Sequence, residues 1–412
     1  MKLGFYIILA AQFFSALADN ALLFAAIALL IALGSPDWYT PVLQSAFVAS
    51  YILLAPFVGA FADSLPKGRV MFISNSIKLF GCAAMLLGVN PLIAYGIVGF
   101  GAAAYSPAKY GILTEYLPSE KLVLANSWME GLTVLAIILG AVVSGILISP
   151  EISTPMLHWW DVPKLTTGID SAPELTIAII MFIYLVAALF NLYIPRVNMD
   201  HKPLSRSPIF LLKEFIHCFR LLWKDPLGQV SLAVTTLFWG AGATLRLLVL
   251  AWAGTVLHYD MGEAAKLTAW VAVGIAIGSV LAAKFVKLDH AVKVLPVGIA
   301  MGVLVLLMIP VTSPLLATVL LIVIGAMGGY FVVPMNALLQ HRGHLLMGSG
   351  RSIAVQNFNE NLSIFAMLAL YAWMEKMDFS IYIIILVFGL LLSGIMTVLY
   401  KKHGHDQDSG KI

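Results

Sequence analysis

Charged residues are scarce in this sequence: Asp, Glu, Lys and Arg together make up only 11% of its 412 residues. Soluble globular proteins carry about 25% charged residues, so the deficit excludes an ordinary cytosolic enzyme, a disordered chain and a nucleic-acid binder. Cysteine is also rare, with Cys82 in an apolar run and Cys218 in a basic stretch. A disulfide between the two is implausible and no metal-ligand cluster is present, so we expect neither metal nor cofactor.

Apolar residues dominate instead, at 61% of the chain with a mean hydropathy of +0.95. About 20 apolar residues are enough for one helix to cross a bilayer. The first apolar run is too long for a signal-peptide core and contains Asp19 and Asn20, so we interpret it as a transmembrane helix. Apolar runs separated by Pro, Gly or charge predict an all-α polytopic membrane protein with twelve transmembrane helices. The predicted spans are 5–33, 41–62, 70–88, 92–107, 126–149, 175–195, 228–257, 264–283, 291–310, 315–334, 352–374 and 379–400.

The basic residues are distributed unevenly between the two sides of the predicted membrane. With the N-terminus inside, 19 of the 24 Lys and Arg residues fall on the inside and three on the outside, while Lys78 and Arg246 lie within spans. This bias follows the positive-inside rule for an even number of spans. We therefore expect both termini to be cytoplasmic.

The longest basic stretch divides the chain into two sets of six spans, and an amphipathic interfacial helix is predicted within it at 209–223. The long outside loop 150–174 receives no role. The expected parts are an N-terminal six-helix bundle (1–195), a basic cytoplasmic linker (196–227), a C-terminal six-helix bundle (228–402) and a polar cytoplasmic tail (403–412).

The two halves of the chain resemble each other. Residues 125–134, ANSWMEGLTV, align with residues 355–364, VQNFNENLSI, and each copy places amide side chains and a glutamate inside an apolar span. Because each half has six spans, the two copies have the same orientation. A parallel repeat about an axis along the membrane normal is the layout of the major facilitator fold, in which the substrate site lies between the halves.

Five ionisable side chains fall inside the predicted spans: Asp19, Lys78, Glu130, Arg246 and Glu360. A charge at the bilayer centre costs about 2.5–3.5 kcal/mol on insertion scales, so such residues normally face a cavity or a partner. Structural ion pairing is the favoured interpretation for Lys78 and Glu130, and a functional role for the other three.

A functional role can take two forms, which the composition does not separate. A protonatable carboxylate can couple transport to a proton gradient. Alternatively, Arg246 binds an anionic group bidentately while Asp19 or Glu360 holds an ammonium, which suits a substrate with both a phosphate and an amine.

The loop between the second and third spans contains Gly59, Asp63, Lys67, Gly68 and Arg69. It resembles the signature that major facilitators carry at this position, a Gly followed four residues later by Asp and then by a Gly flanked by bases. Two extra residues separate the Asp from the second Gly here. We expect the Asp to pair with basic residues and to gate the cytoplasmic side.

Longer segments in both halves resemble the lysophospholipid transporter family, the LplT-type branch of the major facilitators. The matching segments are 15–24 (SALADNALLF), 51–59 (YILLAPFVG), 102–113 (AAAYSPAKYGIL), 237–246 (LFWGAGATLR), 328–340 (GGYFVVPMNALLQ) and 354–361 (AVQNFNEN).

This resemblance implies a flippase rather than an enzyme. Its substrates would be lysophospholipids, chiefly lysophosphatidylethanolamine and lysophosphatidylglycerol, carried from the outer to the inner leaflet of the bacterial inner membrane by alternating access with lateral entry. A separate acyl-ACP-dependent acyltransferase would then re-esterify them. We expect contacts with bilayer lipids, no nucleic-acid partner and a monomer.

The resemblance also assigns residues to roles. Arg246 and, on the exit side, Lys109 would take the phosphate, while acidic and amide side chains would take the amine or glycerol. The residues expected to bind substrate are Asp19, Asn20, Tyr105, Lys109, Arg246, Asn336, Gln340, Gln356, Asn357 and Glu360. Those expected to serve gating or structure are Asp63, Lys67, Arg69, Lys78 and Glu130.

Two other classes of function compete with lysolipid transport. A proton-coupled exporter of amphipathic drugs uses the same fold and similar carboxylates, and a drug-resistance assay with an uncoupler distinguishes it. A membrane-embedded acyltransferase is disfavoured because the sequence has no nucleophile–base cluster on a predicted cytoplasmic loop. His341 and His344, beside Arg342, are interpreted as part of a solvated loop.

Overall fold

The computed structural model describes residues 3–36, 39–160, 169–197, 204, 207–259 and 261–403. This part of the chain consists of α-helices, two short 3-10 helices and the segments that connect them. None of the described residues lies in a strand. The helices up to the middle of the chain are α1 (Leu3–Ala32), α2 (Tyr39–Ser64), α3 (Lys67–Leu86), α4 (Pro91–Tyr116), η1 (Ser119–Lys121), α5 (Leu122–Ile148), α6 (Pro150–Trp160), α7 (Ala172–Leu192) and α8 (Pro208–Lys224). The remaining helices are α9 (Pro226–Val256), α10 (Met261–Phe285), η2 (Leu288–Val294), α11 (Leu295–Leu306), α12 (Pro314–Met347), α13 (Ser349–Lys376) and α14 (Ile381–His403).

Each of the twelve predicted spans coincides with a helix, so the all-α polytopic architecture is confirmed. Among the described residues, ten helices are long and apolar enough to cross a membrane. The helices α4 and α13 are long enough but more polar, because α13 carries a run of amides and α4 carries Ser, Pro and Tyr in its second half. The cytoplasmic position of both termini stays a prediction.

Two helices continue through prolines at which the predicted spans end. α4 passes Pro107 and ends at Tyr116, and α12 passes Pro334 and ends at Met347. A proline inside a helix removes one backbone hydrogen bond, and membrane helices tolerate this where neighbours satisfy the freed carbonyl. The prediction of a solvated loop at 341–344 was therefore wrong, because these residues lie on α12.

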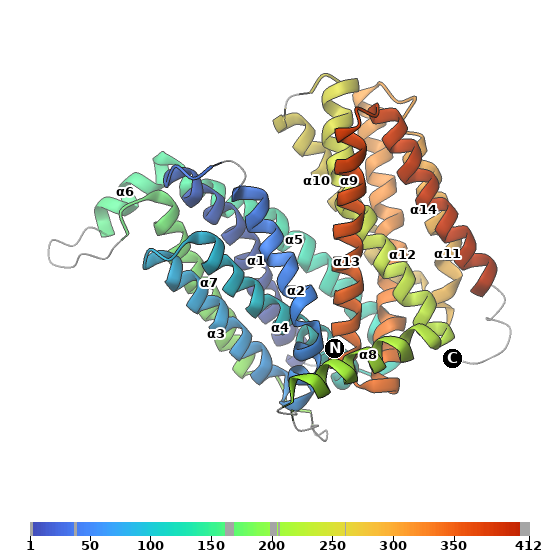
Figure 1. The fold of residues 1–412 in the computed structure, drawn as a ribbon, viewed down its shortest axis with the longest axis horizontal. Helices are drawn as coiled ribbons and strands as arrows, with labels where there is room; N and C mark the ends of the chain where they lie inside the picture. The colour runs from blue at the N-terminus through green and yellow to red at the C-terminus, as the bar shows by residue number, and fades with distance from the viewer. Residues whose placement is uncertain are drawn as a thin grey trace. The chain divides into compact units, whose positions relative to one another are not determined.

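The stretches between spans contain two further helices. The predicted amphipathic helix at 209–223 is confirmed as α8, on which Ile209, Phe210 and Leu212 are exposed. α6 occupies the first part of the predicted outside loop and packs against α7 (Figure 1). Most of the predicted linker start, 198–203 and 205–206, and of the tail, 404–412, lies outside the described residues.

The chain divides into two compact units. Unit 1 comprises Met1–Glu115, Leu135–Ile216 and Ser349–Ala354, and unit 2 comprises Tyr116–Val134, His217–Gly348 and Val355–Ile412. Helices α5 and α13 therefore contribute residues to both units.

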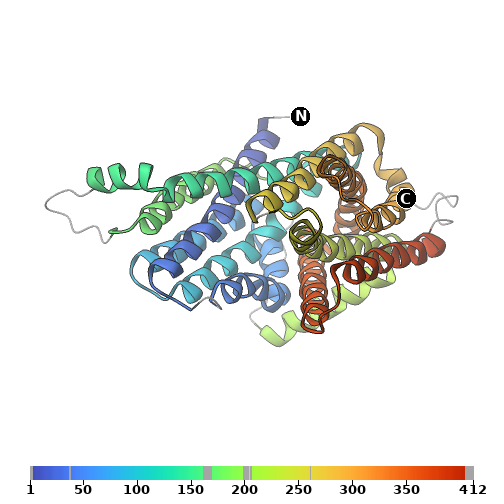
Figure 2. The same cartoon turned by 90° about the horizontal axis from the view of Figure 1, so that it is seen from above.

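In unit 1, α7 packs against both α1 and α3 (Figures 1 and 2). The face of α1 in this contact is rich in alanine, with Ala18, Ala21 and Ala25 fully buried against Tyr184 and other residues of α7. Small side chains let membrane helices approach closely, so dispersion contacts and hydrogen bonds between helices become possible.

In unit 2, α10 packs along α12, and α11 packs along α14. The first contact depends on glycine. A Cβ atom at Gly278 would lie 1.8 Å from the carbonyl oxygen of Ala326, and one at Gly325 would lie 2.2 Å from the carbonyl oxygen of Val271. Only glycine allows the two backbones to come this close.

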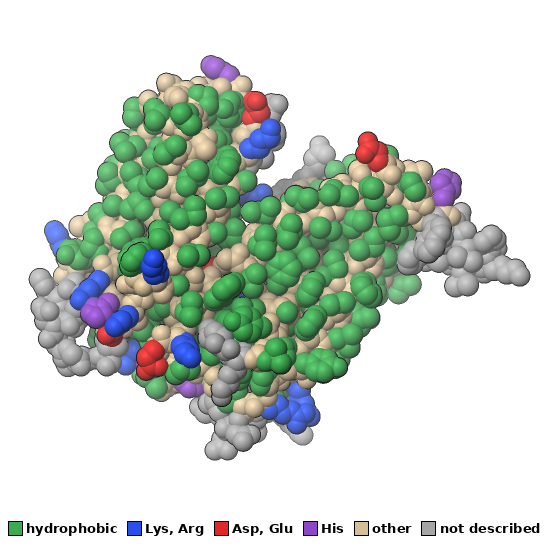
Figure 3. Space-filling view, turned by 180° about the vertical axis from the view of Figure 1, so that it is seen from behind, with side chains coloured by type: hydrophobic (Ala, Val, Ile, Leu, Met, Phe, Trp, Pro, Cys, Tyr) green, Lys and Arg blue, Asp and Glu red, His purple; other side chains and the backbone are tan. Residues whose placement is uncertain are grey.

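Hydrophobic side chains cover most of the face seen in Figure 3, and charged side chains are few in that view. Phe80 and Phe182 are also exposed, in an apolar groove between α3 and α7. Such a surface is expected where lipid chains rather than water surround the helices.

Candidate functional site

A buried ion pair lies inside unit 1, where three helices meet. The side chain of Lys78 on α3 is 0% exposed, and its ammonium nitrogen lies 2.8 Å from the carboxylate of Asp19 on α1. The hydroxyl of Tyr184 on α7 donates a hydrogen bond of 2.6 Å to the same carboxylate. The Asp19 side chain keeps 23% of its surface exposed.

Further polar groups surround the ammonium of Lys78. It donates to the hydroxyl of Ser15 at 3.0 Å, and that hydroxyl donates to the amide oxygen of Asn75 at 2.9 Å. The ring centroids of Tyr105 on α4 and of Tyr184 lie 4.7 Å and 5.4 Å from Lys78 Nζ. Cation–π contacts of this kind stabilise a desolvated ammonium, so this network holds the charge of Lys78 inside an apolar bundle.

A second polar cluster lies in unit 2 around Glu360 on α13. Gln356 Nε2 donates to Glu360 Oε1 at 2.7 Å and to Asn336 Oδ1 on α12 at 2.9 Å. Thr235 on α9 forms a side-chain hydrogen bond with Glu360, and Glu130 on α5 interacts with it electrostatically. Glu360 is 8% exposed, and no Lys or Arg among the described residues forms an ion pair with it. The cluster therefore places Glu360 among amides and beside a second acid, and no ion pair with a described Lys or Arg involves Glu360.

Gln340, which the sequence assigns to substrate binding, lies in a reciprocal pair with Asn126. Asn126 Nδ2 donates to Gln340 Oε1 at 2.9 Å, and Gln340 Nε2 donates back to Asn126 Oδ1 at 2.8 Å. The neighbouring Ser127 hydroxyl donates to the backbone oxygen of Ser279 at 2.7 Å. These bonds join α5 to α12 and α10, so they serve helix packing within unit 2.

The remaining predicted binding residues are Asn20, Lys109, Arg246 and Asn357. Arg246 on α9 is exposed, and no carboxylate among the described residues pairs with it. Asn20 donates to the backbone oxygen of Ala16 at 2.8 Å, and Lys109 Nζ lies 4.6 Å from the ring centroid of Tyr110. Asn357 is buried on α13.

Asp63, near the end of α2, is the centre of a charged network in unit 1. Lys67 Nζ donates to its carboxylate at 2.8 Å, and the backbone nitrogens of Gly350 and Arg351 donate at 2.8 and 3.1 Å. The guanidinium of Arg351 adds a bond of 3.0 Å. Asp63 thus caps the N-terminus of α13, where the helix dipole favours an anion.

The same network includes two more acids. Glu115 at the end of α4 lies 3.1 Å from Lys67 Nζ and accepts a hydrogen bond of 2.6 Å from the hydroxyl of Ser349, and Glu214 on α8 lies 3.1 Å from Arg351 Nε. Sequence reasoning missed Glu115, Glu214 and Arg351, because their partners are far away along the chain. Arg69, grouped with Asp63 in the sequence, forms no ion pair with a described residue.

Replacing Asp63 by Asn is expected to destabilise the protein by about 3 kcal/mol, because it removes the anion from a partly buried group of cations and helix amides. The thermal unfolding midpoint in detergent micelles, followed by tryptophan fluorescence, measures the change. Asp289→Asn is the matched control, since Asp289 is exposed and forms an ion pair with only one described residue, His290. An equal midpoint for both variants would contradict the capping role of Asp63.

Comparison with known proteins places the chain in a family. Residues 8–366 match the family model described as Major Facilitator Superfamily. The lysophospholipid transporter LplT of Yersinia pestis (strain Pestoides F) is 45% identical over 371 residues, which covers 90% of this chain and 86% of that protein. The protein of the same name from Yersinia pseudotuberculosis serotype O:3 (strain YPIII) shows the same identity and coverage.

Solved structures agree in fold. A bacterial homologue of the iron transporter ferroportin, in an outward-facing state, is similar with a TM-score of 0.74 at 15% identity, covering 99% of this chain and 100% of the other. The Major Facilitator Superfamily transporter FucP, in the outward conformation, gives 0.72 at 14% identity, covering 97% and 98%. With the family match and the curated relatives, the helical architecture shows that this chain belongs to the Major Facilitator Superfamily and, within it, to the family of the lysophospholipid transporter LplT.

Proposed function

We propose that this protein is a lysophospholipid transporter of the bacterial inner membrane. Its substrates are chiefly lysophosphatidylethanolamine and lysophosphatidylglycerol, moved from the outer to the inner leaflet, where a separate acyl-ACP-dependent acyltransferase re-esterifies them. The observation that carries the proposal is the 45% identity, over 90% of the chain, to proteins named as lysophospholipid transporters.

The chemistry of the headgroup fits two groups in unit 2. A lysophospholipid carries a phosphate, and the ethanolamine form also carries an ammonium. Arg246, exposed on α9, offers a planar guanidinium for bidentate binding of phosphate oxygens. Glu360, without a cation among its described neighbours, offers a carboxylate for the ammonium, and Gln356 and Asn336 beside it offer amides for glycerol hydroxyls.

Arg246 and Glu360 act at different positions along the path in this proposal. Glu360 bonds to Thr235 on α9, and Arg246 lies eleven residues further along the same helix. At 1.5 Å per residue this separation is about 16 Å along the helix axis. The phosphate and the amine of a phosphoethanolamine headgroup, in contrast, are only a few bonds apart. The headgroup therefore meets the two residues in succession.

Asp19 has a different role from Glu360, because Lys78 already balances its charge. With 23% of its side-chain surface exposed, Asp19 is suited to accept a hydrogen bond from a hydroxyl rather than to hold an ammonium. Alternating access requires contacts that break and re-form. We propose that the hydrogen bonds and ion pairs of the Asp63 network at the start of α13 are such contacts. The acyl chain enters laterally and stays among lipid-facing apolar side chains.

Uptake into proteoliposomes tests the proposed function. Purified protein is reconstituted, lysophosphatidylethanolamine, lysophosphatidylglycerol or lysophosphatidylcholine is added to the outer leaflet, and movement to the opposite leaflet is followed for each headgroup. We expect protein-dependent movement of the ethanolamine and glycerol forms above that in protein-free vesicles. Absence of such movement, with uncoupler-sensitive export of a cationic amphipathic dye, would point to a drug exporter instead.

Glu360→Gln is expected to lower uptake of lysophosphatidylethanolamine about tenfold and to change uptake of lysophosphatidylglycerol little. The variant keeps the shape and hydrogen bonding of the side chain but removes the charge that would hold an ammonium, and a hydrogen bond to a charged group contributes about 1.5–3 kcal/mol. The same proteoliposome assay measures both headgroups side by side. An equal loss for the two lipids would argue against an ammonium contact.

A further inference from the structure

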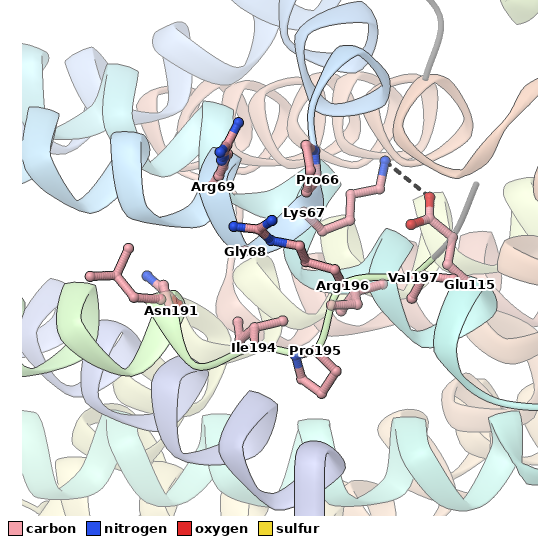
Figure 4. Close-up of a pocket in the computed structure, with 12 residues that line it drawn as sticks. Pro66, Lys67, Gly68, Arg69, Glu115, Asn191, Ile194, Pro195, Arg196 and Val197 are labelled. Atoms are coloured by element: carbon pink, nitrogen blue, oxygen red, sulfur yellow. Dashed lines mark ion pairs between the residues drawn. The ribbon is translucent and has the colours of Figure 1, made fainter. Parts of the chain in front are cut away.

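A small cavity lies in unit 1 beside the Asp63 network, where α3 begins and where α4 and α7 end (Figure 4). Its volume of about 80 Å³ exceeds the 10–15 Å³ that one water molecule requires, so it has room for a larger polar group. The side chains that matter for its chemistry are Lys67, Arg69, Glu115, Asn191 and Arg196.

The lining of this cavity has an excess of positive charge. Lys67 and Glu115 lie 3.1 Å apart and balance each other (Figure 4). Arg69, in the first turn of α3, and Arg196, in the segment after α7, are both exposed, and neither forms an ion pair with a described residue. In Figure 4 the guanidinium of Arg196 reaches back toward the start of α3, where Arg69 lies.

The charged network beside the cavity does not cancel this excess. It contains the acids Asp63, Glu115 and Glu214 and the bases Lys67 and Arg351, and thus one more acid than bases. Those acids are already bound to their partners within the network. Arg69 and Arg196, which form no ion pair with a described residue, add two positive charges and so outweigh the single excess negative charge of the network. The cavity is therefore attractive to an anion.

Asn191 is the second observation that points to a ligand. Its side chain lines the cavity and is 1% exposed, yet neither its amide nitrogen nor its amide oxygen has a hydrogen-bond partner among the described residues. Buried polar side-chain atoms are almost always satisfied, and an unsatisfied one costs about 1–3 kcal/mol. The approach of α3 to this residue is close, since a Cβ atom on Gly68 would lie 2.7 Å from the backbone oxygen of Asn191.

We propose that this cavity binds a phosphate group, supplied either by a phospholipid headgroup or by free inorganic phosphate. Arg69 and Arg196 would contact phosphate oxygens, and the amide nitrogen of Asn191 would donate a further hydrogen bond. Arginine is suited to this contact because its guanidinium presents paired donors to two oxygens, and basic pockets between membrane helices on the cytoplasmic side bind lipid headgroups. The site shares no residue with the proposed substrate site of Arg246 and Glu360, so this proposal does not depend on that one.

The test uses the purified full-length protein in detergent, whose thermal unfolding midpoint is measured against increasing dioctanoylphosphatidylglycerol or inorganic phosphate. Dioctanoylglycerol, which lacks the phosphate, is the ligand control. The variants are Arg69→Gln with Arg196→Gln, Arg196→Gln alone and Asn191→Leu. The matched control variant is Arg220→Gln, which removes an exposed arginine from α8.

We expect the phosphate-bearing probe to raise the midpoint, and its half-saturating concentration to rise at least tenfold in the double variant and in Asn191→Leu but not in Arg220→Gln. This response to the lipid alone identifies a headgroup site, and the same response to inorganic phosphate identifies a free-phosphate site. If the double variant does not fold, the half-saturating concentration of the single variant Arg196→Gln tests the proposal instead. Arg196 lies outside any helix, so its replacement should not disturb the fold. Equal responses of wild type and variants, or equal stabilisation by dioctanoylglycerol, would overturn the proposal.

Discussion

Asp19→Ala is expected to destabilise the protein by about 3–5 kcal/mol, and adding Lys78→Met is expected to recover most of that loss. Lys78 is fully buried, and Asp19 is its partner in an ion pair at 2.8 Å. Removal of one partner leaves an uncompensated buried charge, whereas replacement of both by apolar side chains is often close to neutral. The measurement is the free energy of unfolding in mixed micelles for the two single variants and the double variant.

Lys376→Met serves as the control for this series, because Lys376 is exposed at the end of α13 and its replacement should change stability by no more than about 0.5 kcal/mol. Destabilisations of Asp19→Ala and Lys78→Met that simply add in the double variant would show that the pair is not coupled.

The stable double variant also separates structure from transport. Uptake of lysophospholipid that stays low in the double variant would assign Asp19 a contact with substrate beyond neutralising Lys78. That is the result we expect, because the Asp19 side chain remains partly exposed. Normal uptake by a protein lacking both charges would leave Asp19 with a structural role only.

Arg246→Gln is expected to lower lysophospholipid uptake about tenfold to hundredfold while leaving stability nearly unchanged. A charge-assisted hydrogen bond contributes about 1.5–3 kcal/mol, and each 1.4 kcal/mol is a factor of ten. The substitution should change the stability of the fold little, because the Arg246 side chain is exposed and forms an ion pair with no described carboxylate. Uptake by proteoliposomes and the thermal midpoint are measured on the same preparation.

Arg246→Lys refines the interpretation of that result. Lysine keeps the charge but loses the planar pair of donors, so we expect partial uptake, between wild type and Arg246→Gln. Full activity in Arg246→Gln would remove Arg246 from the binding site. Loss of both uptake and stability would indicate a packing role instead.

The locations of the membrane helices followed from the sequence because burying an apolar run in lipid depends on composition alone. The runs that became α1 and α9, and the amphipathic pattern that became α8, were readable for this reason. The C-terminal ends of α4 and α12 were not, since whether a helix continues past Pro107 or Pro334 depends on tertiary neighbours that satisfy the freed backbone groups.

The contacts of the polar residues were likewise predictable from the sequence only in part. The pair Asp63 and Lys67 was predictable, because residues four apart meet on one helix face or across a short turn. Its contacts with Gly350 and Arg351 were not, because they join residues 287 and 288 positions apart. Sequence likewise marked Gln340 as a rare intramembrane amide but could not show that Asn126 occupies both of its hydrogen-bonding groups.

The sequence by itself determined the class of the protein, its helices and which few side chains are ionisable inside apolar spans, because each of these depends on local composition. Only the tertiary structure decided what those side chains do. It paired Lys78 with Asp19, left Glu360 beside another acid, and buried Asn191, without a hydrogen-bond partner among the described residues, in the cavity that Arg69 and Arg196 also line. The physical reason is that a charge or amide in an apolar interior is satisfied by whatever group the packing brings within about 3 Å, and packing brings together residues far apart in the chain.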